Sequence, residues 1–302
     1  MTRVVLVMLA SLILTRSGGA AEGAASNYFP GSYGSFGVAL APEPGFVAAS
    51  YTLFYGADAE RSVLQGRVNT SVDTFAAIEM IAGFYTFESE VLGARLATAA
   101  FVPFGYVELD GRLGTVSVEA DEFQLGDMSV VPASLYWSFG NLHLNVYELI
   151  FIPTGPYDVD RLVNVGRNYW SFDTVFAATW FDADWGTELS AVVGVLANTK
   201  NPDTDYQTGA EFHLDLMLNQ FLAETFALGL HGYYYDQLTG DSGSGAALGS
   251  FESLSIGIGP AALWQPQRFD GRLALQLSWL HDLDAENRIE ADYVVFTASW
   301  AF

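Results

Sequence analysis

Short segments in which apolar residues recur at every second position follow one another along most of the chain, and this period constrains the fold most. In "YVVFTASWAF", at the C-terminus, Val294, Phe296, Ala298, Trp300 and Phe302 are all apolar, whereas the residues between them are smaller or more polar on average. Successive side chains of a β-strand point to opposite faces, so such a strand has one wholly apolar face. The period predicts an all-β chain.

Turn signals separate the alternating segments and so delimit the strands. We expect twelve strands, at residues 46–55, 75–86, 94–107, 127–139, 142–152, 169–181, 186–197, 209–218, 225–236, 252–264, 271–281 and 293–302. Each is as long as the roughly 9–11 residues of a tilted membrane-spanning strand, or slightly longer.

The connections between these strands alternate strictly between long and short. Residues 56–74 and 108–126 are two of the long ones, whereas "GN" at Gly140–Asn141 and "DADW" at 182–185 are short. Outer-membrane barrels have long loops outside and short turns on the periplasmic side. We therefore predict a transmembrane antiparallel up-and-down β-barrel of 12 strands, with 14 as the alternative, and with both termini in the periplasm.

A soluble β-sandwich also alternates, but its apolar face would point to a protein core. It would not explain the alternating connections, the export signal or the terminal Phe302. An aromatic residue at the end of such a strand resembles the C-terminal signal of outer-membrane proteins, so we expect the barrel-assembly machinery as a partner. The formal charge of −23 leaves no basic patch for a phosphate backbone, and no nucleic acid is expected.

Residues 1–21 have the pattern of a signal peptide. Arg3 precedes the apolar stretch 4–15, and "SGGAAEG" offers small residues for cleavage. The stretch is too short for a spanning helix, which needs about 20 apolar residues. We expect residues 22–44, rich in Gly, Ser, Pro and aromatics, to form a partial plug at the periplasmic mouth, and residues 45–302 to form the barrel in the outer membrane of a Gram-negative bacterium.

If the large apolar residues face lipid, the residues between them line the interior. On strand 75–86 this parity turns Ile78, Met80 and Phe84 outward and Glu79 inward. Glu148 is an exception, because it has the same parity as the apolar residues of strand 142–152. We therefore expect either a β-bulge that turns it inward or a position near the membrane interface. The parity predicts a substrate path lined by Glu79, Arg95, His143, Tyr147, Asp173, Glu188, His213, Asp215, His231, Tyr233, Tyr235 and Gln276.

Three of the four histidines fall in this predicted lumen beside acids. His213 and Asp215, two residues apart on one face, could hold a metal. Hydrogen-bonded polar side chains normally fill a small barrel, so we predict neither a metal nor a cofactor. Hydrolysis would need a Ser–His pair held by a third group, and no serine motif marks a nucleophile. We predict no catalytic residue and no enzyme, although an outer-membrane lipid hydrolase stays an alternative.

The long connection before the last predicted strand is strongly acidic, and two interpretations of it stay open. It contains Asp282, Asp284, Glu286, Glu290 and Asp292. Such a loop could bind lipopolysaccharide through divalent cations, or it could simply be solvated. We favour solvation, but expect outer-membrane lipid and lipopolysaccharide around the barrel.

Several stretches are similar, in order, to a known family. They are "EGAASNYFPGSYGSFGVALAPEPGFVAASYTLFY" (22–55), "PTGPYD" (153–158), "NVGRNYW" (164–170), "NTKNPDTDYQTGAEFH" (198–213), "GYYYDQLTGDSGSG" (232–245) and "GIGPA" (257–261). Together they resemble the outer-membrane barrels labelled "meta-pathway of phenol degradation". The resemblance implies a transporter that passes hydrophobic or aromatic compounds, and it carries over no catalytic residue.

We accordingly predict passive uptake of small hydrophobic or aromatic solutes through an outer-membrane channel. No energy-coupling box is evident near the N-terminus, which favours diffusion over driven uptake. The rival interpretation is a structural or surface-interaction barrel with a filled lumen, because a small barrel can pack its interior completely.

Overall fold

The computed structural model describes residues 22, 26–63, 68–113, 116–246, 250, 252–288 and 290–302. The predicted signal peptide lies outside the described residues. Within them, no helix is long and apolar enough to cross a membrane.

The described residues form thirteen strands and one 3-10 turn, η2 (Gln267–Phe269). The strands are β1 (Gly45–Val63), β2 (Val68–Val91), β3 (Ala94–Leu113), β4 (Val116–Leu125), β5 (Met128–Phe139), β6 (Leu142–Ile152), β7 (Ser171–Asp182), β8 (Thr187–Asn198), β9 (Glu211–Ala223), β10 (Phe226–Gln237), β11 (Leu254–Trp264), β12 (Leu273–Glu286) and β13 (Ala291–Ala301).

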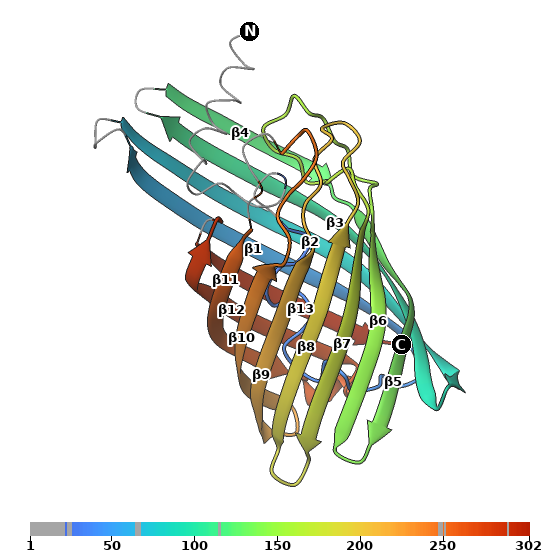
Figure 1. Ribbon diagram of the computed structural model, residues 1–302. Coiled ribbons are helices and arrows are strands. Elements are labelled where there is room, and N and C mark those ends of the chain that lie inside the picture. Colours follow the sequence, from blue (N-terminus) through green and yellow to red (C-terminus); the bar gives the residue numbers. More distant parts are fainter. Residues whose placement is uncertain are drawn as a thin grey trace.

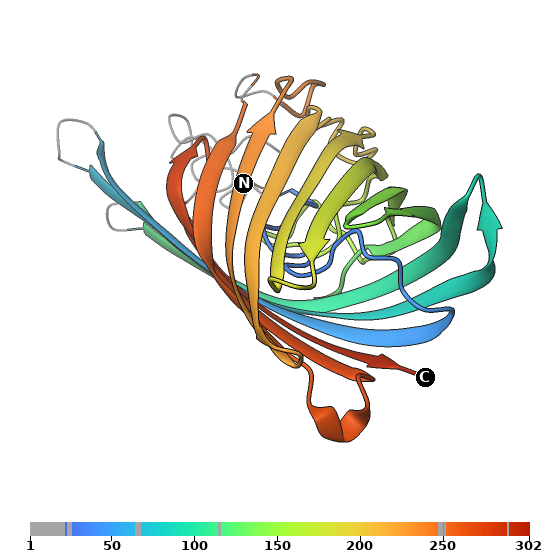
Figure 2. The same ribbon diagram turned by 90° about the horizontal axis from the view of Figure 1, so that it is seen from below.

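The sheet closes on itself, as Figures 1 and 2 show. Neighbouring strands pair antiparallel, β2 pairs with β3, and β1 pairs with β13 from Val47–Ala301 to Ala57–Ala291. All described strands except β4 belong to this ring, because β5 follows β3 directly in it. The predicted closed barrel of 12 antiparallel strands, with the first strand paired to the last, is confirmed, and β4 is additional.

The two ends of the described chain lie at opposite ends of the barrel. At the short-turn end, the Phe302 N–H donates to the Phe46 carbonyl oxygen at 3.0 Å, and the two rings lie 5.6 Å apart. At the long-loop end, the Glu22 N–H donates to Thr208 Oγ1 at 3.2 Å, and its carboxylate accepts from Thr204 Oγ1 at 2.6 Å. Glu22 thus lies at the long-loop end, and the periplasmic location of both termini stays a prediction.

Two connections predicted as long loops, 56–74 and 108–126, are largely strand. The β1–β2 pairing continues to Val63–Val68, and β4 pairs with the upper half of β3. Together they form an extension of β1–β4 that projects beyond the ring (Figure 1). Its register places Asp73, Asp110 and Glu119 in one row across three strands. Like charges directly opposite destabilise a sheet, and these acids also interrupt the apolar alternation from which the strands were predicted.

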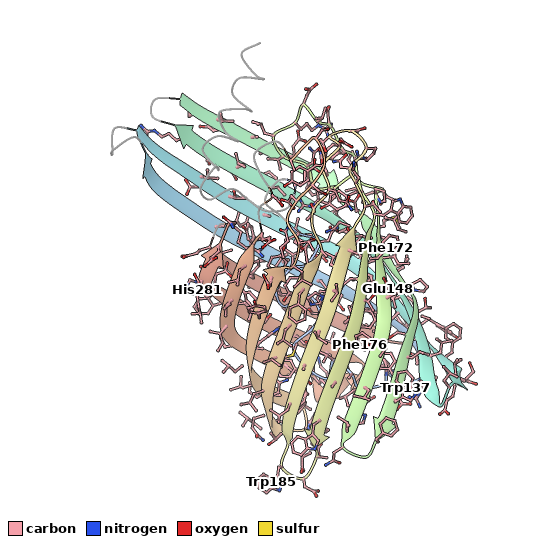
Figure 3. The ribbon with its side chains drawn as sticks, in the orientation of Figure 1. Trp137, Glu148, Phe172, Phe176, Trp185 and His281 are labelled. Atoms are coloured by element: carbon pink, nitrogen blue, oxygen red, sulfur yellow. The ribbon has the colours of Figure 1, made fainter. Side chains whose placement is uncertain are left out.

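Apolar side chains cover the outside of the ring. Phe172 and Phe176 on β7 point away from the barrel (Figure 3), and Phe176 is 53% exposed. At the long-loop end this belt meets polar groups, because the Asp292 carboxylate accepts from Trp279 Nε1 at 2.8 Å and lies 3.1 Å from His281 Nδ1. A closed barrel with an apolar outer face indicates the outer membrane.

The interior is filled in part by the N-terminal segment, residues 26–44, which crosses the lumen (Figure 2). Phe29 packs against a cluster of buried residues on β1, β10, β12 and β13 that includes Leu53, Tyr293 and Val295. Ala39 joins a second buried cluster and Phe36 a third. The segment thus supplies apolar surface to the inside of the wall.

This apolar filling reverses the predicted parity of β2. Ile78 pairs with Leu53 and packs on the same cluster as Phe29, so Ile78 faces inward. Glu79 therefore points outward, on the face of Ile81 and Tyr85, where its carboxylate accepts from the hydroxyls of Ser50 and Thr52. The prediction of Glu79 in the lumen is wrong, as are the outward positions of Ile78, Met80 and Phe84.

Glu148 keeps the outward parity of its strand, as Figure 3 shows. The β6–β7 register is continuous on both sides of it, so no bulge on β6 turns it inward. Thr174 Oγ1, its cross-strand neighbour, donates to Glu148 Oε2 at 2.7 Å. The bulge lies instead in β5, between Val130 and Ser134.

Candidate functional site in the barrel lumen

The N-terminal segment is fastened to β7–β10 by donors of the segment and acceptors of the wall. Ser26 Oγ donates to Glu211, and the Tyr28 hydroxyl donates to Asp215. Further along, the Tyr33 hydroxyl donates to Asp173 and the Gly37 N–H donates to Glu188. The wall therefore presents a row of carboxylates to the segment.

Tyr28 lies at the centre of this interface and is 1% exposed. Its hydroxyl lies 2.9 Å from Asp215 Oδ2. Its ring stacks on His213, with centroids 4.4 Å apart and planes at 18°, and lies parallel to Tyr235 at 5.9 Å. The phenol of Tyr28 is thus enclosed by two rings and bonded at its hydroxyl.

Tyr33 occupies the neighbouring position. Its hydroxyl donates to Asp173 Oδ2, which also lies 3.0 Å from His213 Nε2. The rings of Tyr33 and His213 are 4.8 Å apart and tilted by 39°. His213 therefore contacts both tyrosines of the segment, and its Nδ1, which has no hydrogen-bond partner among the described residues, lies 3.8 Å from Asp215 Oδ2.

Ser35, His231 and Asp215 form a chain of polar contacts. Ser35 Oγ lies 3.1 Å from His231 Nδ1, and His231 Nε2 lies 2.8 Å from Asp215 Oδ1. The order of groups resembles that of a hydrolase. Ser35 is only 4% exposed and both partners are 0% exposed, so in this conformation the chain fastens the segment rather than meeting a substrate.

Glu188 receives several donors at one of its oxygens. The Gly37 N–H, Ser190 Oγ and Asn219 Nδ2 lie 2.9, 2.8 and 2.9 Å from Glu188 Oε1. Glu188 Oε2 and Asn219 Oδ1 are buried without a hydrogen-bond partner among the described residues. The wall has more oxygen acceptors here than donors.

A second group of tyrosines lies near the long-loop end. The Tyr233 hydroxyl donates to Asp282, which also accepts from Ser255 Oγ at 2.6 Å and from the Ala291 N–H at 2.9 Å. Asp282 is thus a buried residue of β12 and not part of an outer loop as predicted. Arg288 lies 4.8 Å from the Tyr235 ring centroid. These groups close the interior below the loops.

The long loops are tied together above the lumen. Lys200 Nζ lies 2.8 Å from Asp205, which also accepts from Ser244. The hydrogen bonds from Lys200 and Ser244 hold the pKa of Asp205 well below its usual range. Asn201 Nδ2 donates to Glu22 Oε2 at 2.9 Å and so joins the segment to the same loops.

The hydrogen bonds that join the N-terminal segment to β7–β10 form one network, which we call the central network. Four other predicted lumen residues lie away from it. Near the short-turn end, Arg95 donates to the Pro42 carbonyl at 2.8 Å, and His143 lies 2.9 Å from Ser138 Oγ. Tyr147 packs with the cluster that contains Ala39. Gln276 has the parity of the interior, opposite the buried Leu263.

The central network brings together six of the predicted residues, and a seventh, Tyr233, belongs to the second group of tyrosines. The six are Asp173, Glu188, His213, Asp215, His231 and Tyr235. Sequence reasoning missed their partners Ser26, Tyr28, Tyr33 and Ser35, which belong to one stretch, "SNYFPGSYGS". Its density of tyrosine and serine before the first strand is a signal that could have identified them. Within the described residues, no three His, Cys, Asp or Glu side chains group to hold a metal ion.

Comparison with known proteins agrees with this architecture. The family model described as "Putative MetA-pathway of phenol degradation" matches residues 54–298. The COG4313 outer membrane channel from Pseudomonas putida F1 is similar in structure, with a TM-score of 0.74, 16% identity, and coverage of 91% of this chain and 100% of that one. At that identity the likeness concerns the fold.

Two other outer-membrane barrels are less similar. The transport unit of the autotransporter AIDA-I from Escherichia coli has a TM-score of 0.49 and 12% identity, and the match covers 87% of this chain and 92% of that one. A FadL homologue from Pseudomonas aeruginosa has a TM-score of 0.42 and 9% identity, covering 95% and 98%. No curated protein matches the sequence of this chain.

Proposed function

We propose that this chain, which belongs to the family described as "Putative MetA-pathway of phenol degradation", is an outer-membrane channel for passive uptake of small hydrophobic or aromatic compounds. The family name supports an aromatic cargo. The similar barrel from Pseudomonas putida is named a channel, which supports transport.

The observation that carries the proposal is the way in which the lumen is filled. Residues 26–44 lie inside the ring but form no strand, and they contact β7–β10 largely through side chains. A segment outside the sheet can leave its place without breaking the barrel, because the ladder hydrogen bonds of the wall remain intact. We infer that its displacement opens the path, and that the segment acts as the plug.

One observation favours the second candidate, a structural barrel with a filled lumen. His213, Asp215 and His231 are all 0% exposed, so the centre of the lumen is packed in this conformation. The two candidates differ in whether the segment moves.

Transport and planar-bilayer recordings separate the candidates. Gram-negative cells that produce the chain should accumulate a labelled alkylphenol faster than cells without it. Deletion of residues 24–42 should raise the single-channel conductance of the purified barrel. Equal accumulation together with unchanged conductance would favour the structural barrel.

We propose two further contacts of the barrel. Phe302 is 74% exposed at the end of the chain, where the assembly machinery could bind it. Asp73, Asp110 and Glu119 form one row across the β1–β4 extension, and we propose that this row faces the lipopolysaccharide head groups.

A further inference from the structure

We propose that the wall formed by β7, β9 and β10 contains two binding sites for a hydroxyl-bearing aromatic ring, and that Tyr28 and Tyr33 of the N-terminal segment occupy them as internal ligands. The ligand class is the neutral phenols. The inference rests on the proposed function only for the statement that such compounds are cargo, since the sites themselves follow from the contacts.

The first site has every element that a phenol needs. His213 and Tyr235 enclose the ring of Tyr28, and Asp215 Oδ2 accepts its hydroxyl proton at 2.9 Å. Asp215 is held by His231 at 2.8 Å, so the acceptor is fixed in place without the tyrosine. Stacked aromatic rings and a hydrogen bond to a carboxylate are both favourable when water is excluded.

The second site shares a wall with the first. Asp173 Oδ2 accepts from the Tyr33 hydroxyl, and His213 Nε2 lies 3.0 Å from the same oxygen and 3.2 Å from Asp173 Oδ1. The ring of Tyr33 lies 5.7 Å from that of Tyr28. Two phenols could therefore occupy adjacent positions on one face of the lumen.

The charge of the wall determines which aromatic compounds fit. Asp215 and Asp173 accept hydrogen bonds from the hydroxyls of Tyr28 and Tyr33, so a compound that replaces either tyrosine must bring a donor of its own. A hydroxyl group supplies the missing donor. An aromatic carboxylate would bring another negative charge to Asp215, and a plain hydrocarbon would leave Asp215 Oδ2 without the donor that Tyr28 supplies.

A phenol and the tyrosines of the segment compete for the same two sites. The tyrosines are tethered, so they compete at a high effective concentration and keep the sites filled when no phenol is present. A phenol that replaces Tyr28 conserves the hydrogen bond to Asp215 and removes one of the contacts that hold the segment. Binding of the cargo class thereby favours the open lumen.

Chemical rescue of a truncated tyrosine tests the sites directly. The variant Tyr28→Ala loses the 4-hydroxyphenyl group, and 4-methylphenol is a small compound that carries this group. Calorimetric titration and the midpoint of thermal unfolding in detergent should be measured with 4-methylphenol, toluene and 4-methylbenzoate. Tyr85→Ala, which removes a tyrosine that is 47% exposed on the outer face, is the matched control.

We expect saturable binding of 4-methylphenol to Tyr28→Ala, with a rise in its unfolding midpoint. Toluene should bind about 10-fold more weakly or worse, because it lacks the hydrogen bond to a charged acceptor. 4-Methylbenzoate and the control variant should show no saturable effect. Equal binding of toluene and 4-methylphenol, or no binding of either, would overturn the inference.

Tyr33→Ala, tested with the same compounds, asks the same question at Asp173 and serves if Tyr28→Ala does not fold. These readouts do not depend on transport. Rescue without faster cellular accumulation would refute the proposed function and leave the sites, whereas accumulation without rescue would refute the sites alone.

Discussion

The two halves of the barrel interior hold the same N-terminal segment by different chemistry. On β7–β10 the segment makes buried hydrogen bonds, such as that from Tyr28 to Asp215, beside the apolar contacts of Ala39. On β1, β12 and β13 the contacts are apolar, as where Phe29 packs on the cluster of Leu53 and Val295. An interior can thus be polar in one half and apolar in the other when the segment that fills it matches both.

This difference explains where polar side chains lie on the outside. In the apolar half, Glu79 faces outward and is satisfied by Ser50 and Thr52. In the polar half, the acids face the segment and the large apolar residues face lipid. Whether a polar side chain faces inward or outward thus depends on what fills the lumen beside it. Mutations in the two halves should therefore differ in their effect on stability.

We expect the largest effect from Asp215→Ala. The change leaves the buried His231 and the Tyr28 hydroxyl without their acceptor and should lower the free energy of unfolding by about 3–5 kcal/mol. Urea unfolding in detergent, followed by circular dichroism, measures it. Asp110→Ala in the exposed extension, the control, should stay within about 0.5 kcal/mol of the wild type. If both variants lose equally little stability, the hydrogen bonds to Asp215 do not stabilise the fold.

Leu53→Ala should have the next largest effect. It removes buried apolar surface beneath Phe29 and should cost about 2–4 kcal/mol in the same assay. A loss below about 1 kcal/mol would indicate that the segment does not pack on the apolar half.

Gly194→Ala tests the polar half without removing a polar group. A Cβ at this position would lie 2.1 Å from His213 Nε2 and 2.7 Å from Asp173 Oδ1, so it must displace that pair. We expect a loss of about 1–3 kcal/mol. Gly56→Ala is the matched control, since a Cβ there meets nothing within 4 Å. If both alanines are tolerated alike, His213 is not held where the structure places it.

The smallest effect should come from Glu79→Gln. The amide keeps hydrogen-bonding capacity for Ser50 and Thr52 and removes a charge from the lipid side, so stability should stay within about 1 kcal/mol of the wild type or rise slightly. A loss as large as that of Asp215→Ala would place Glu79 in the interior after all.

The strand period and the connection lengths predicted the closed barrel, because both are imposed by the membrane. The inward positions of His213 and Asp215 match the structure, because on β9 the lumen partner is polar and lipid lies on the other side. On β2 the same rule failed, because Phe29 brings an apolar surface inside. Periodicity reports that two faces differ and cannot say which one meets lipid.

Neither the strands of the extension nor the role of the segment's tyrosines could be predicted from the sequence. The acids of 68–74 and 116–125 interrupt the apolar alternation, although backbone pairing with β1 and β3 still holds them as strand. Tyr28 lies 187 residues from Asp215 in the sequence, and only the closed ring brings them together.

The central claim is that the N-terminal segment lies inside the ring, and one engineered crosslink tests it most directly. The chain has no cysteine, and a Cβ on Gly31 would lie 3.3 Å from Ser278 Oγ on β12. Gly34 has a similar left-handed backbone, with φ of 94° against 80° for Gly31, but a Cβ there would meet only Val38. It supplies the control for backbone strain.

The account predicts that Gly31→Cys with Ser278→Cys forms a disulfide in the outer membrane, whereas Gly34→Cys with Ser278→Cys stays reduced and reacts with maleimide. If both pairs stay reduced and react alike, the segment does not lie against β12, and the account is contradicted.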